Sequence, residues 1–213
     1  VVAVAAATVA RSAHAQDMPD FADDRERAMV LLDEASQLLP GAGKGNNAGK
    51  ERLAESYAQL GGYDQAKLAL ATIVEAERAV GQCKVAAAMA ERDDIDTCQA
   101  MLDEVGDRPA VLEMPFNKVD YKELAYIQLI AAKLRAGDPA GASALMDRVT
   151  TPDNRHKARR TFLLGAAKNG QIDVAVQSVE RIGDPFTEAE LRCDLINICI
   201  DNGDLVRAVQ IYN

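Results

Sequence analysis

Apolar residues along this chain recur at helical spacing in pairs of segments, and a short turn separates the two segments of each pair. The residues at the centre of these turns follow one another at intervals of 32, 44, 33 and 33 residues: Gly61, Asp93, Gly137, Gly170 and Gly203. Glycine adopts the left-handed backbone conformation that ends a helix without a steric penalty, whereas aspartate tolerates it less well. The pattern therefore predicts five turns, each of which ends one amphipathic helix and precedes another.

Apolar and small residues stand at fixed offsets from these turns. Leu53 and Tyr57 precede the first turn and Leu70 follows it, and the later pairs carry apolar residues at the same offsets. Two helices approach to about 8 to 10 Å only where one of them offers a small side chain. We expect such residues, five positions after each turn, to be buried where the helices cross: Ala66, Cys98, Ala142, Ala175 and Ala208.

The composition favours an all-α fold. Hydrophobic residues make up 48% of the chain but aromatic residues only 4%, and small apolar side chains suit helices packed at close range. No run of alternating β-branched and polar residues is bounded by Asn-Gly or Asp-Gly, so no strand or hairpin is predicted. Pro109 and Pro115 forbid a continuous helix across Gly106 to Asp120. We interpret that segment as a spacer or as an insertion that contacts a partner.

The first pair combines a large apolar residue, a small one and an aromatic with a small and a large residue after the turn: Leu53, Ala54, Tyr57, Ala66 and Leu70. This order resembles the tetratricopeptide repeat, over about Phe21 to Asn213. The resemblance implies a right-handed α-solenoid of tandem antiparallel helical hairpins, which serves as a non-catalytic scaffold for other proteins. The third pair departs from the pattern at Lys133 and Pro139, so we expect it to be looser or rotated.

Three regions are expected. Residues 1–15 have the pattern of a signal-peptide remnant, with an apolar stretch from Val1 to Ala10 before Arg11 and a small-x-small triplet from Ala13 to Ala15. Residues 16–46 are predicted to form a capping helix, over Phe21 to Pro40, and a Gly-rich linker, and residues 47–213 five hairpins, the last of them truncated. The signal predicts an exported, bacterial-type protein of the periplasm or extracellular space. Alternatively, the alanine-rich start is an ordinary helix, and the chain is a regulatory or sensory region of a larger cytoplasmic protein.

The charge of the chain restricts its partners. The formal net charge is −9 and the isoelectric point is about 4.8, so nucleic acid and anionic membranes would repel it. A pentatricopeptide-like RNA reader has a similar period but would need a basic groove along most pairs. No segment after the alanine-rich start has the roughly 18 apolar residues of a membrane span, so no membrane insertion of the mature chain is expected. The expected partner is another protein or a peptide, and the oligomeric state is left open.

The inventory for catalysis is poor. The chain has two histidines, His14 and His156, and it has no C-x-x-C pair and no phosphate-binding glycine loop. We therefore expect no enzyme, no cofactor and no metal site. Cys193 and Cys199 lie six positions apart on one predicted helix, about 9 Å along its axis and too far for a disulfide, so we expect four thiols. Cys98 and Cys199 are interpreted as small core residues.

A basic stretch, Arg155 to Arg160, stands out in this acidic chain. The tetratricopeptide resemblance implies that the first helices line a concave groove, with inward side chains thirteen, ten, six, three and two residues before each turn. In the fifth pair these offsets select Glu190, Cys193, Asn197 and Asp201. The candidate groove for an acidic peptide is formed by five residues: Lys157, Arg160, Leu164, Lys168 and Asn197. The alternative is an ordinary solvated helix face.

Overall fold

The computed structural model describes residues 24–39, 46–114, 117–180 and 182–212, and within them the chain is all-α apart from one small β hairpin. The predicted signal remnant at residues 1–15 lies outside the described residues, as do Phe21 and Pro40. The chain divides into two compact units, Val1–Gly81 and Gln82–Asn213. The boundary falls within the helix α5 (Glu75–Glu91).

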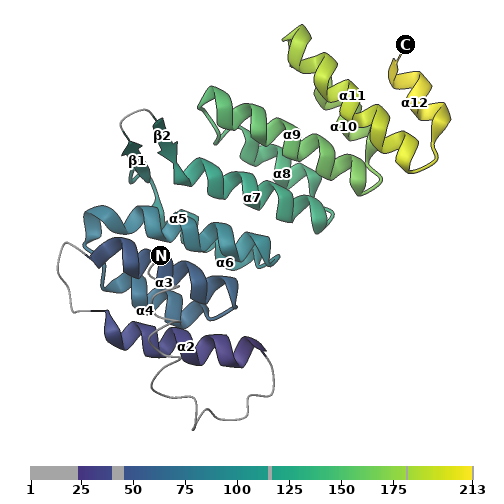
Figure 1. The fold of residues 1–213 in the computed structure, drawn as a ribbon. Helices are drawn as coiled ribbons and strands as arrows, with labels where there is room; N and C mark the ends of the chain where they lie inside the picture. Colours follow the sequence, from purple (N-terminus) through teal and green to yellow (C-terminus); the bar gives the residue numbers. More distant parts are fainter. Residues whose placement is uncertain (1–23, 40–45, 115–116, 181, 213) are drawn as a thin grey trace. The chain divides into compact units, whose positions relative to one another are not determined.

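The first unit contains α2 (Asp24–Leu38), α3 (Asn47–Gln59) and α4 (Tyr63–Ala71). The helices α3 and α4 form an antiparallel hairpin, and α2 packs along α3 (Figure 1). The hairpin core includes the residues that the repeat pattern selects: Leu53, Ala54, Tyr57, Ala66 and Leu70. The helix α2 lies within the range predicted for a capping helix.

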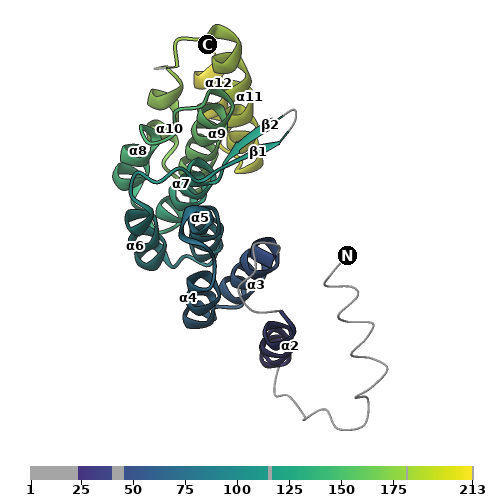
Figure 2. The same ribbon diagram turned by 90° about the vertical axis from the view of Figure 1, so that its left-hand side faces the viewer.

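The second unit contains α6 (Ile95–Val105), β1 (Val111–Met114), β2 (Asn117–Asp120), α7 (Tyr121–Arg135), α8 (Pro139–Met146), α9 (Pro152–Lys168), α10 (Ile172–Val179), α11 (Pro185–Asp201) and α12 (Leu205–Tyr212). Within this unit α7, α9 and α11 lie side by side in one layer, and α8 and α10 lie in the other (Figures 1 and 2). The helices α7 and α9 each therefore pack against their own hairpin partner and against the first helix of the next hairpin.

The five predicted turns share one geometry. Gly61, Gly137, Gly170 and Gly203 have φ between 75° and 79°, and Asp93 has φ 61°. At every turn, the amide after this residue donates to the carbonyl five positions back, over 2.7 to 3.0 Å. The left-handed turns are thus confirmed, including the one at aspartate. The Asp93 carboxylate also accepts a hydrogen bond of 2.7 Å from Arg135 Nε, which fixes its side chain.

The residue that follows the left-handed position is often also the N-cap of the second helix. The side chains of Asp94, Asp138 and Asp204 accept hydrogen bonds from amides three residues later, over 3.2, 2.8 and 3.0 Å. Aspartate in this position satisfies one of the free amides of a helix N-terminus. One short segment therefore ends the first helix and caps the second.

Replacing Gly170 by alanine is expected to lower the free energy of unfolding by about 1 to 2 kcal/mol, because a Cβ makes left-handed backbone unfavourable. No heavy atom lies within 4 Å of the added Cβ, so the cost is conformational and not steric. Urea unfolding followed by circular dichroism measures the change, and Gly170→Asn should cost less. Equal stability of the alanine variant and the native protein would contradict the geometry of this turn.

The small residues five positions after the turns are buried, as predicted. Ala66, Cys98, Ala142 and Ala175 have no exposed surface, and Ala208 is 6% exposed. Cys98 and Cys199 are buried core residues, and burial raises the pKa of the Cys98 thiol to about 12. All four cysteines are free thiols, which confirms that prediction.

The prediction that the chain contains no β-strand and no β hairpin is wrong. β1 and β2 pair antiparallel, with Val111 opposite Asp120 and Leu112 opposite Val119. The two four-residue strands are not joined by Asn-Gly or Asp-Gly, the sequence signals used to predict a β hairpin. A hydrogen bond next to the open end of the β hairpin holds the two strands together instead: Tyr121 N donates to the carbonyl of buried Ala110 over 2.9 Å. The hairpin accounts for the long interval of 44 residues, and Figure 2 shows it projecting on the side of α7 and α9.

The turn of the third hairpin has the same backbone geometry as the other four turns. Lys133 forms an ion pair of 3.1 Å with Asp138, the residue that caps α8. Pro139 occupies the first turn of α8, where no backbone donor is required. The two departures from the repeat pattern are therefore accommodated at the start of α8, and Ala142 remains fully buried.

Candidate peptide-binding face

The N-terminus of α9 is anchored by a buried carboxylate on α7. Glu123 is 4% exposed, and its Oε1 accepts hydrogen bonds from the Thr150 amide at 2.7 Å, the Thr150 hydroxyl at 2.8 Å and the Thr151 amide at 3.0 Å. Oε2 accepts from the Thr151 hydroxyl and, at 2.9 Å, from Asn154 Nδ2. Burial alone raises the pKa of Glu123, but the hydrogen bonds outweigh it and lower the pKa to about 2. The connection therefore fixes where α9 begins against α7.

The outer face of α9 carries the predicted groove residues. Its inner face buries Ala158, Phe162, Leu163, Ala166 and Ala167. Lys157, Arg160 and Lys168 are exposed on the other side, and Leu164 is half-buried. Among the described residues, neither Lys157 nor Lys168 has an ion-pair or hydrogen-bond partner. Two ammonium groups with an apolar side chain between them are thus presented on one helix.

Arg160 differs from these lysines because α11 neutralises it. Its Nη1 lies 3.2 Å from Glu190 Oε1, and its Nη2 lies 3.1 Å from Asp194 Oδ2. His156 Nε2 lies 3.9 Å from the other oxygen of Glu190. The spacing in the sequence selects Arg160 and Glu190 separately, does not pair them, and does not select Asp194. Opposite charges at related offsets in successive first helices were the signal that could have revealed the pairs.

The candidate residue on α11 adjoins this cluster. Asn197 is exposed, on the same helix face as Glu190 and Cys193, which stand seven and four positions before it. The ion pairs of Arg160 show that this face lies next to that of α9. The structure therefore brings the five predicted residues onto one surface of the second unit. Only Lys157 and Lys168 contribute uncompensated positive charge there.

The described residues contain no group of three or more histidine, cysteine, aspartate or glutamate side chains that could hold a metal ion. Among the helices of the described segments, none is both long and apolar enough to cross a membrane.

Comparison with known proteins finds no matching family model, no matching curated protein and no matching solved structure. The tetratricopeptide assignment therefore stays a prediction that depends on the chain's own residues.

Proposed function

We propose that this protein is a non-catalytic, tetratricopeptide-like scaffold whose hairpins stack as a right-handed solenoid. Its α9 and α11 face binds an extended acidic segment of another protein. The observation that carries the proposal is the pair of exposed, uncompensated lysines on α9, with Leu164 between them. The repeated hairpin geometry supports it, because a rigid array of helices presents side chains at fixed spacing.

The spacing of the two lysines defines the ligand. Lys157 and Lys168 are eleven residues apart on one helix, which corresponds to about 16 Å at 1.5 Å per residue. An extended peptide advances about 3.3 Å per residue. The ligand is therefore a segment with two carboxylates about five residues apart and an apolar side chain between them that contacts Leu164. Asn197 can donate to and accept from the peptide backbone.

Panning a random peptide phage library against the whole protein tests this function. Enriched peptides are expected to carry two acidic residues about five positions apart around an apolar one. Combining Lys157→Glu with Lys168→Glu should weaken their binding by about tenfold or more in fluorescence anisotropy, because attraction becomes repulsion. The effect should shrink at high salt.

Lys67→Glu is the matched control, since Lys67 is an exposed lysine of α4 in the other unit. Peptides that bind the double variant as tightly as the native protein would remove the proposed face, as would enrichment without any acidic preference. Export is proposed alongside, from the apolar start of the chain, and cell fractionation separates it from the cytoplasmic alternative.

A further inference from the structure

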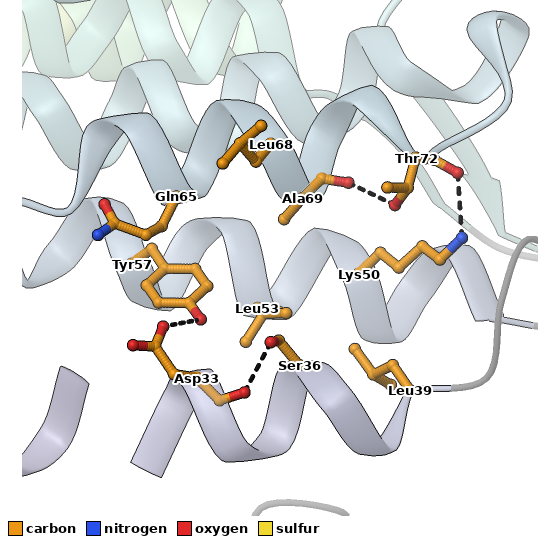
Figure 3. Close-up of a pocket in the computed structure, with 10 residues that line it drawn as sticks. All are labelled: Asp33, Ser36, Leu39, Lys50, Leu53, Tyr57, Gln65, Leu68, Ala69 and Thr72. Carbon is orange, nitrogen blue, oxygen red and sulfur yellow. Dashed lines mark hydrogen bonds between the residues drawn. The ribbon is translucent and has the colours of Figure 1, made fainter. Parts of the chain in front are cut away.

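A cavity of about 440 Å³ lies between α2, α3 and α4 in the first unit. Figure 3 shows Lys50, Leu53 and Tyr57 of α3 between Asp33 on α2 and Leu68 on α4. Its volume falls within the range of about 300 to 1,000 Å³ that small-molecule sites occupy. The cavity is remote in sequence from the α9 and α11 face, so it constitutes a separate candidate site.

The cavity exists because α2 is held close to the hairpin near both of its ends. A Cβ on Gly62 would lie 2.7 Å from Met29 Cε, and a Cβ on Gly49 would lie 3.2 Å from Leu39 Cδ2. Gly62 stands where three of the other second helices, α6, α8 and α12, have a capping aspartate. Arg25 Nε adds a hydrogen bond of 2.6 Å to the Leu60 carbonyl. Between these contacts none of the α2 side chains is fully buried, so the inner side of α2 remains open to the cavity.

One end of the cavity presents a buried ammonium group. Lys50 is only 6% exposed, and its Nζ donates to the Thr72 carbonyl at 3.0 Å. The residues that the structure describes give this group a neutral acceptor and no carboxylate. A buried charge is costly unless an opposite charge compensates it. This end is therefore suited to an anionic group on a ligand.

The opposite end presents a carboxylate. The Tyr57 hydroxyl donates to Asp33 Oδ1 at 2.7 Å (Figure 3), and burial together with the Asp33 hydrogen bond raises the pKa of Tyr57 to about 12. Tyr57 therefore remains a donor and holds the carboxylate in place. Gln65 lies on the facing wall and offers a further acceptor. This end is suited to a cationic group with several N–H donors.

Apolar side chains separate the two charged ends. Leu53 lies at the floor between them, and Leu68 on α4 is 70% exposed beside it. Lys50 and Tyr57, which mark the two ends of the cavity, are seven residues apart on α3, so their backbone positions are separated by about 10 Å at about 1.5 Å per residue. An extended peptide of about three residues spans this distance.

We propose that this cavity binds a short apolar peptide with free termini, its carboxylate at Lys50 and its ammonium group at Asp33. Complementary charge at both ends and an apolar middle match a zwitterion better than a fatty acid, whose tail would meet Asp33. Leu68 covers the central side chain of the peptide. This binding is independent of the proposed α9 and α11 face.

Titration of the whole ¹⁵N-labelled protein with the tripeptide Ala-Leu-Ala tests the proposal by nuclear magnetic resonance. The free tripeptide is expected to shift the amide signals of Leu53 and Leu68. Blocking its N-terminus by acetylation or its C-terminus by amidation should each weaken binding by about tenfold. Equal binding of free and blocked peptides, or no shifts at these residues up to about 10 mM tripeptide, would overturn the proposal.

Two variants assign the ends. Lys50→Met keeps the apolar stem and should abolish the preference for a free carboxylate alone. Asp33→Asn keeps an acceptor for Tyr57 and should abolish the preference for a free ammonium group alone. Lys67→Met and Asp64→Asn, at exposed positions of α4, are the matched controls. Unaltered preferences in both site variants would refute the assignment, and the blocked peptides test the native protein even if a variant fails to fold.

Discussion

Replacing Glu123 by glutamine is expected to lower the free energy of unfolding by about 3 kcal/mol near neutral pH. All five hydrogen bonds at this buried carboxylate come from donors on Thr150, Thr151 and Asn154. A glutamine would turn an NH₂ group towards some of these donors and leave them without an acceptor. Hydrogen exchange should accelerate first at the start of α9, because that is where the donors lie.

The free energy of unfolding lost in the Glu123→Gln variant should depend on pH. The pKa of Glu123 is lowered from 4.5 to about 2 in the folded protein, so its ionised form contributes stability that is fully present above pH 4.5. That contribution is lost as the pH falls towards 2. Urea unfolding between pH 6 and pH 2 should therefore show the native protein and Glu123→Gln converging in acid. Glu180→Gln, at an exposed position of the same unit, is the control. A difference that does not change with pH would show that the carboxylate charge is not what stabilises the fold.

Replacing Leu134 by alanine should destabilise the protein by about 2 to 5 kcal/mol, because this side chain is fully buried between α7 and α9. A Cβ on Gly165 of α9 would lie 2.7 Å from Leu134 Cδ1. Asn169 Nδ2 also donates to the Leu134 carbonyl at 2.9 Å. Leu134 therefore lies in close contact with α9. Urea unfolding of the two variants Leu134→Ala and Leu164→Ala measures the free energy of unfolding that each loses. The loss should be much smaller for Leu164→Ala, because Leu164 is only half-buried.

A double-mutant cycle isolates this contact. Gly165→Ala should not stabilise the native protein, because the new methyl group meets Leu134. In the Leu134→Ala background the same change should restore about 1 kcal/mol, since alanine favours a helix over glycine by that amount. Additive effects of the two substitutions would show that the residues do not interact.

The features that could be predicted from the sequence are those held by contacts between residues close together in the chain. The five turns and the burial of the small residues after them followed from spacing alone, because each turn is closed by bonds within six consecutive residues. The β hairpin could not be predicted in this way, because Ala110 and the start of α7 hold its base. The burial of Glu123 also escaped prediction, since its partners lie 27 to 31 residues away.

The candidate site was predictable only in part. The helical offsets placed Lys157, Leu164 and Lys168 together on the outer face of α9. They could not show that Glu190 and Asp194 would neutralise Arg160, because that depends on how two helices lie together. No pattern in the sequence predicted the cavity beside α2, although Gly49 and Gly62 mark where α2 approaches the hairpin.

The shared turn bears on how the chain folds. Every hydrogen bond that closes a turn or caps its second helix joins residues at most five positions apart. Contacts so close in sequence require little loop closure and form quickly. A hairpin such as α9–α10 can thus nucleate during synthesis before the residues that follow it have left the ribosome, and later hairpins can then add to it one at a time.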